Sequence, residues 1–365
     1  MNHTEDVRVN AAMVTLARES RGLTQTELAP FLHISQAMLS KIEAGTKETS
    51  EAVLALLVEV LRYPPEFFQQ TDTVFGPGLS EFFHRKRQDV GVKVLGKVHA
   101  QINIMRMHVA RLLRSVEVPE LKIRPLDMAE FGGKPQEVAR AIRAAWQIPE
   151  GPIPNVIRMI EDAGGIVIRY PFGSARIDAI SRWVPGLPPL FFVNEGLSTD
   201  RERLTLCHEL GHLIMHDVPN ATMEAEANQF AAELLMPARE IAPHLDRITI
   251  ERLGALKPYW RVSMAALLVR AKELKKVSAK EEQFLWMRMA PYRRQEPPEL
   301  DLATETPTLL QEILDLHRDT FGYGLSEFAK MLNAQPVELV TMYGLGQTQQ
   351  ETRARLRLIR TQQTA

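Results

Sequence analysis

The spacing of apolar residues divides the chain into helices with only a little β-structure. Between residues 8 and 70, apolar positions recur at helical intervals and are interrupted by turn-forming residues such as Gly22. Two short runs, Ile-Val-Ile at 166–168 and Leu-Phe-Phe-Val at 190–193, instead have the β-branched and aromatic character of strands. We therefore expect a mainly α protein with a small β-sheet, which is an α+β chain.

Glycine and proline clusters break this pattern and set the expected domain boundaries. The expected segments are an all-α head (1–72), a basic helical linker (73–124), a mixed domain (125–245), a helical extension (246–290), a proline-rich linker (291–308) and a small C-terminal helical unit (309–365). Residues 84–124 carry ten Lys or Arg against three acids along an apolar stripe of helical period. We expect one long basic amphipathic helix in this stretch.

Composition excludes several classes of protein. Cys207 is the single cysteine, so no disulfide can form within the chain and a reducing cytoplasm is the expected location. The N-terminus lacks the basic start and apolar run of a secretory signal. No run of about 18 apolar residues is present, so no membrane partner is expected.

The candidate chemistry is concentrated in residues 208–212, His-Glu-Leu-Gly-His. Two histidines four residues apart project from one face of a helix. At this spacing both neutral rings can bind one Zn²⁺ ion. Glu209 lies beside them and is placed to take a proton from water rather than to bind metal. A catalytic zinc site also needs a third protein ligand and one open position.

The next predicted helix offers two carboxylates, Glu224 and Glu226, for the third position. Glu224 shares a face with small and apolar residues that suit packing against the first helix, whereas Glu226 lies nearer the polar side. Asn228 follows Glu224 by one turn and is placed to orient a ligating histidine. We predict one Zn²⁺ per chain, bound by His208, His212 and Glu224.

Two neighbouring residues are expected to have structural roles. His216 stands one turn beyond the motif, and the residues that follow it, Asp217 and Pro219, indicate a helix end. We therefore expect His216 to cap the helix rather than to bind metal. Cys207 points away from the metal face and is expected to be a buried thiol.

Residues 23–45 have the pattern of two short helices joined by a tight turn. Thr24 and Glu27 form the signature of a capping box at the start of the first helix. In a helix-turn-helix, the second helix presents its first residues and one exposed face to the bases. The residues expected to contact DNA are Gln25, on a phosphate, and Ser35, Gln36, Ala37 and Lys41 on the second helix.

The charge of the head leaves a second interpretation open. Residues 1–65 contain six Lys or Arg and eight Asp or Glu. This excess of acids attracts phosphate poorly. A protein-docking module is therefore the alternative, unless dimerisation or the basic linker compensates.

These residues resemble two known families. RGLTQTELA and ISQAMLSKIEAG look like the XRE helix-turn-helix family over residues 8–65. DRERLTLCHELGHLIMH and EAEANQFAAELLMP resemble the ImmA/IrrE family of zinc metallopeptidases over residues 136–243. The resemblance implies a zincin-like fold of the gluzincin type and carries over zinc ligands to His208, His212 and Glu224, and the catalytic glutamate to Glu209. The family pattern Glu-x-x-Ala-Asn begins at the ligand, which favours Glu224.

The fusion of these two families implies a regulatory function. The resemblance implies a zinc endopeptidase that cleaves a repressor or antitoxin and so changes transcription, in a stress response or in mobile elements. The alternative is a transcriptional regulator or toxin–antitoxin component whose zinc site is structural or inactive. The expected partners are operator DNA, the cleaved protein and a second copy of the chain.

Overall fold

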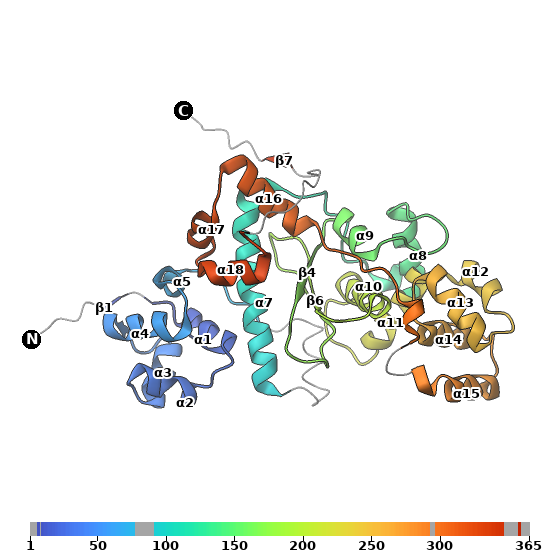
Figure 1. Ribbon diagram of the computed structural model, residues 1–365, viewed down its shortest axis with the longest axis horizontal. Helices are drawn as coiled ribbons and strands as arrows, with labels where there is room; N and C mark the ends of the chain where they lie inside the picture. Colours follow the sequence, from blue (N-terminus) through green and yellow to red (C-terminus); the bar gives the residue numbers. More distant parts are fainter. Residues whose placement is uncertain (1–5, 8, 77–90, 293–295, 347–356, 359–365) are drawn as a thin grey trace, which may run out of the picture. The chain divides into compact units, whose positions relative to one another are not determined.

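The computed structural model describes residues 6–7, 9–76, 91–292, 296–346 and 357–358 (Figure 1). Residues 77–90, in the predicted basic linker, lie outside the described residues. The chain is mainly helical with a small sheet, as predicted. It divides into two compact units, one formed by residues 1–118, 172–176 and 310–365 and the other by residues 119–171 and 177–309.

The first unit contains the N-terminal head, one long helix and the C-terminal helices. Its helices are α1 (Ala11–Ser20), α2 (Gln25–Leu28), α3 (Gln36–Glu43), α4 (Glu51–Leu61), α5 (Pro65–Gln69), α7 (Val92–Leu112), α16 (Leu309–Phe321), α17 (Leu325–Leu332) and α18 (Pro336–Tyr343). Its strands form two antiparallel pairs, β1 (Asp6–Val7) with β2 (Thr49–Ser50) and β3 (Val116–Glu117) with β7 (Arg357–Leu358).

Helix α7 is buried along most of its length and is part of the core of this unit. Ala100, Ile104 and Met107 pack into the apolar cluster of the head. In the described residues the helix is shorter than the predicted 84–124, because it gives way to a 3₁₀ turn at Leu113 and then to β3. The β-branched Val116 and Val118, and then Pro119, disfavour further helix.

The second unit surrounds a three-stranded sheet. Its strands are β4 (Ile166–Tyr170), β5 (Ala179–Arg182) and β6 (Leu190–Asn194). Its helices are α8 (Pro135–Ala145), α9 (Val156–Asp162), α10 (Thr199–Met215), α11 (Met223–Leu235), α12 (Ala238–Ile241), α13 (Ile250–Trp260), α14 (Met264–Glu273) and α15 (Ala279–Arg288). In all the described helices, none has the combined length and apolar surface that crossing a bilayer requires.

The order of the sheet is β4–β6–β5, with β4 parallel and β5 antiparallel to the central β6. Strands β4 and β6 lie where the sequence predicts them. The sequence pattern does not predict β5, because its four residues, Ala-Ile-Ser-Arg, are too few to show a period. This strand forms one edge of the sheet and contributes a residue to the candidate site.

Buried charges anchor the first turns of α10. Lys257 donates to Asp200 at 2.7 Å, and Arg203 forms an ion pair with Glu305. All four side chains are almost entirely buried. Removing one partner of such a pair leaves an uncompensated buried charge, which costs about 3–5 kcal/mol. These pairs therefore fix the position of α10 one to two turns before the histidine motif.

Gly165 lets α9 lie close against the sheet. A Cβ atom at this position would lie 2.7 Å from Ile160 Cγ2 and 2.9 Å from Phe191 Cε2. Both contacts are shorter than carbon atoms tolerate, so a larger residue must push the helix from the sheet.

We predict that Gly165→Ala lowers the free energy of unfolding of the second unit by about 1–3 kcal/mol. The control is Gly96→Ala in α7, where the described residues place no atom within 4 Å of the added Cβ, the helix's own backbone aside. That change should raise the stability of the first unit by about 1 kcal/mol through helix propensity. Scanning calorimetry measures both. An unchanged transition for Gly165→Ala would show that the helix shifts at no cost.

Candidate functional site

Helices α10 and α11 pack side by side, and a glycine sets their separation (Figure 1). At Gly211 a Cβ atom would lie 3.0 Å from Phe230 Cδ1. The missing side chain therefore leaves room for the phenyl ring of α11 against the backbone of α10. This contact brings the first turn of α11 beside the middle of α10.

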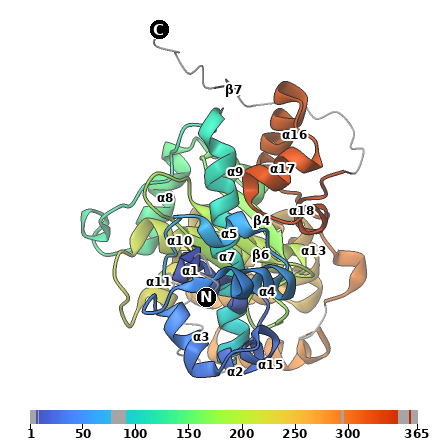
Figure 2. The same ribbon diagram turned by 90° about the vertical axis from the view of Figure 1, so that its left-hand side faces the viewer.

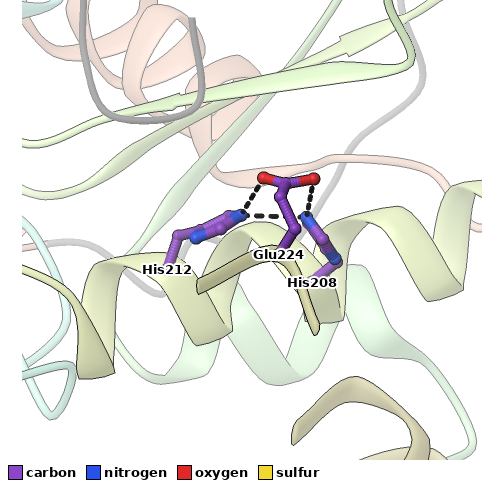
Figure 3. Close-up of side chains that lie close together, drawn as sticks. All are labelled: His208, His212 and Glu224. Atoms are coloured by element: carbon purple, nitrogen blue, oxygen red, sulfur yellow. Dashed lines mark hydrogen bonds and ion pairs between the residues drawn. The ribbon is translucent and has the colours of Figure 1, made fainter. Parts of the chain in front are cut away.

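His208, His212 and Glu224 converge at this contact (Figure 3). The Nε2 atoms of the two histidines are 2.9 Å apart. Glu224 Oε1 lies 3.2 Å from His212 Nε2, and Oε2 lies 3.9 Å from His208 Nε2. Tetrahedral zinc with bonds of about 2.0–2.1 Å places its ligand atoms about 3.4 Å apart. The spacing of these three groups therefore suits one ion.

The second nitrogen of each ring determines which atom faces the ion. His208 Nδ1 lies 3.0 Å from Asn228 Oδ1, which only accepts, so Nδ1 donates. His216 Nε2 lies 3.1 Å from Glu226 Oε2 and donates to this carboxylate. His216 Nδ1 must then accept from His212 Nδ1, at 3.1 Å. In both motif histidines the proton is therefore on Nδ1.

Both Nε2 atoms consequently direct lone pairs toward each other and toward the Glu224 carboxylate. Burial, together with the adjacent His212, lowers the pKa of His208, which keeps its ring neutral. Two lone pairs and a carboxylate at these distances repel one another unless a cation lies between them. The donor set therefore fits a divalent metal such as Zn²⁺.

Glu209 is fixed by the edge strand of the sheet. Its side chain is only 3% exposed, and Oε2 accepts hydrogen bonds from the Ser181 amide at 3.0 Å and the Ser181 hydroxyl at 2.6 Å. Ser181 lies on the edge strand β5, and its amide donates to Glu209. This arrangement positions a carboxylate on α10 directly after the first metal-ligand candidate.

The head forms the predicted pair of short helices, with α2 and α3 next to each other in Figure 2. Glu27 and Thr24 complete the capping box, and His33 makes the turn in the left-handed region at φ 53°. The Ser35 hydroxyl caps α3 by accepting from the Met38 amide. The α3 residues predicted to contact DNA lie on one exposed face: Ser35, Gln36, Ala37 and Lys41.

A chain of hydrogen bonds orients the glutamines of this face. Buried Arg18 donates to Glu43 at 2.6 Å, and Gln25 donates to the same carboxylate at 2.9 Å. Gln36 in turn donates to Gln25 Oε1 at 2.7 Å. The side chain of Gln36 at the start of α3 is therefore connected, through Gln25 and Glu43, to the buried Arg18.

Residues 15–68 match the helix-turn-helix family, and residues 160–272 match the peptidase family M78, described as the IrrE N-terminal-like domain. The chain therefore carries an N-terminal segment similar to helix-turn-helix domains and a later segment similar to the IrrE N-terminal-like domain. The sequence resemblance to both families is thereby confirmed. No curated protein matches the chain significantly.

In the IrrE-like domain, three residues make contacts around the candidate site that the sequence pattern does not predict. Ser181 lies on the unpredicted strand, and Glu226 and His216 form the link to His212. His216 also ends α10, with its amide donating to the His212 carbonyl at 3.1 Å, so the predicted cap is present. The available signal was the recurrence of histidine four residues after His212, which places the two rings on one helix face.

Cys207 takes no part in this cluster. The side chain is fully buried in the core of the IrrE-like domain. Burial raises the pKa of its thiol to about 12. It is therefore a packing residue in the thiol form, as predicted.

We predict that His216→Phe lowers the zinc affinity of the chain about 10–100-fold, because the ring no longer orients His212 while its volume is kept. Competition against a chromogenic chelator measures this affinity directly. His33→Asn, in the helix-turn-helix turn, is the control and should leave the affinity unchanged. Equal affinities for His216→Phe and the unmodified chain would show that His212 needs no such support.

Proposed function

We propose that the IrrE-like domain is a zinc-dependent endopeptidase that cleaves one repressor or antitoxin protein, and that the helix-turn-helix domain directs this activity to transcription. The observation that carries the proposal is the convergence of His208, His212 and Glu224 beside a fixed Glu209. Three protein ligands are typical of catalytic zinc, whereas structural zinc sites are closed by a fourth.

The proposed reaction is hydrolysis of a peptide bond. Zinc bound by the three side chains would supply Lewis acidity at this position. Glu209 takes the proton of the attacking water and delivers it to the leaving amine. Because Ser181 holds Oε2 through two hydrogen bonds, we assign this transfer to Oε1.

The edge strand supports a peptide as the substrate. Strand β5 ends the sheet, and its Ser181 amide is directed to Glu209. An extended peptide that adds to a sheet edge gains main-chain hydrogen bonds. A peptide paired with β5 would pass beside the Glu209 carboxylate. The repressor or antitoxin as target is inferred from the regulatory domain on the same chain.

We predict that Glu209→Gln keeps zinc but reduces cleavage of the repressor or antitoxin encoded beside this chain by about 10²–10⁴-fold, because the Glu209 carboxylate is lost as the general base. Metal analysis and a cleavage assay by mass spectrometry measure the two properties. Glu195→Gln, an exposed carboxylate of the same domain, serves as the control and should cleave normally. A Glu209→Gln chain that still cleaves at the normal rate would falsify the mechanism.

We further propose that the face of α3 with Gln36, Ala37 and Lys41 enters the groove of operator DNA, where Lys41 also neutralises a phosphate, and that Gln25 and Ser35 contact the DNA backbone. The exposure of this face and the hydrogen bond that Gln36 donates to Gln25 support this assignment. A homodimer would present two such helices to a two-fold symmetric operator. DNA binding and the buried thiol of the single cysteine support a cytoplasmic location.

We predict that Lys41→Ala weakens duplex binding and reduces the slope of log affinity against log salt by about one, since one phosphate contact is lost. Fluorescence anisotropy over a salt series provides this slope. Lys280→Ala, an exposed lysine in α15 of the other domain, is the matched control. If both variants bind with the same slope, Lys41 makes no phosphate contact.

A second candidate function is a regulator or toxin–antitoxin component in which the metal is structural or the site is inactive. The burial of Glu209 and its two hydrogen bonds to Ser181 favour it, since both would also suit a carboxylate that only ties α10 to β5. If the chain binds its operator but does not cleave the repressor or antitoxin encoded beside it, this second function is supported over the first.

A further inference from the structure

Residues 318–343 repeat the backbone of residues 18–43 at a constant spacing of three hundred positions. Gly22 and Gly322 both have positive φ, at 66° and 67°. His33 and Asn333 both end a helix in the left-handed region, at φ 53° and 50°. Left-handed backbone is uncommon outside glycine, so its recurrence at equivalent places indicates the same turn.

The hydrogen bonds around this turn also recur. The Ile34 amide donates to Ala29 at 3.2 Å, and the Ala334 amide donates to Ala329 at 3.1 Å. The Glu27 carboxylate accepts from the amide three residues before it at 2.8 Å, and the Glu327 carboxylate does the same at 3.0 Å. The next helix begins at the equivalent position in both copies, Gln36 in α3 and Pro336 in α18.

Equivalent positions also form the two cores. The buried pairs are Met13 and Ile313, Val14 and Leu314, Leu28 and Phe328, Leu32 and Leu332, and Leu39 and Leu339. The constant spacing ends after the last helix of each copy. The glycine with positive φ that follows this helix is Gly45 in the first copy and Gly344 in the second, which is one residue short of the spacing. Helices α16, α17 and α18 thus correspond to α1, to α2 with its 3₁₀ extension, and to α3.

The second copy lacks the groups that orient and form the DNA-facing surface of the first. The replacements are Leu325 for Gln25, Pro336 for Gln36, Thr341 for Lys41 and Tyr343 for Glu43. Arg318 is retained, but it pairs with Asp315 and Asp319 instead of a residue on the second helix. Residues 309–345 contain two Lys or Arg against five Asp or Glu, a balance that repels phosphate.

The turn and second helix of this copy instead contact the first unit. At the turn, Arg111 of α7 donates to the Leu332 carbonyl at 3.1 Å. On the second helix, the Tyr343 hydroxyl hydrogen-bonds to His108 of α7 at 2.9 Å, with both side chains buried.

Glu338 of the same helix forms an ion pair with Arg21 of the first copy at 2.5 Å. Tyr343 stands where Glu43 completes the hydrogen-bond chain of the first copy. The position of Glu43 is therefore occupied in the second copy by Tyr343, which contacts α7.

We infer that residues 309–345 are a second helix-turn-helix, produced by duplication, that binds α7 and the first copy instead of DNA. Its function is to brace the C-terminal end of α7, the helix whose Ala100, Ile104 and Met107 pack against the head. The inference concerns a segment outside the matched helix-turn-helix residues 15–68 and does not depend on peptidase activity.

Equivalent substitutions in the full chain separate a DNA-reading role from a bracing role. Lys41→Ala and Thr341→Ala are compared for binding to a mixed-sequence duplex at low salt. We expect Thr341→Ala to bind like the unmodified chain. If it loses as much affinity as Lys41→Ala, the second copy is a DNA reader and the inference is overturned. If the unmodified chain binds no DNA, the proposed function of the head fails, while the bracing role is decided by the next experiment.

The bracing contact is tested by hydrogen exchange of the α7 amides in the full chain. Tyr343→Phe removes only the hydroxyl, so the fold should be kept, and we expect exchange in residues 104–112 to accelerate about tenfold. Thr341→Ala, an exposed position on the same helix, should leave it unchanged. Glu338→Arg should also accelerate exchange, and adding Arg21→Glu should restore it. Unchanged exchange in Tyr343→Phe and Glu338→Arg would remove the bracing role.

Discussion

The close contact between α10 and α11 is the constraint on which the candidate site depends. Gly211 leaves space for Phe230, and this places Glu224 opposite the two histidines of α10. The contact at Gly211 is apolar, but it has an electrostatic consequence. It holds the Glu224 carboxylate close to the Nε2 lone pairs of His208 and His212. The buried pairs Asp200–Lys257 and Arg203–Glu305 hold α10 in place before the histidine motif.

The same helices supply the support behind the ligand atoms. His208 is oriented from α11 by Asn228, and His212 is oriented by His216, which leads on to Glu226 of α11. Two acids in the first turn of α11 thus have different contacts, because Glu224 faces the rings of His208 and His212 and Glu226 faces His216 at the end of α10. The tautomers of both histidines follow from these partners, so hydrogen bonds behind the rings turn both Nε2 atoms toward the position that a cation would occupy.

In the first unit, the head and residues 309–345 have similar backbones but different residues at their exposed positions. The first copy has a hydrogen-bond chain from Arg18 to Gln36 that ends on an exposed face. The second copy directs Tyr343, at the position of Glu43, to α7. The fold of a helix-turn-helix depends on its turn and on a few buried apolar positions, and these positions correspond in both copies. Its binding partner depends on the exposed positions, which differ.

The sequence by itself determined those features that depend on short-range spacing. Helical period places the two histidines on one face, and the capping box and turn residues define the helix-turn-helix. The preference for Glu224 over Glu226 also follows from position on a helix. Only the packed structure, however, shows Glu224 close to His208 and His212. Tertiary structure alone decided the contacts of Ser181 with Glu209 and of Glu226 with His216, and the burial of α7. These contacts join elements whose relative position depends on packing of the whole unit, and local residue patterns carry no record of that packing.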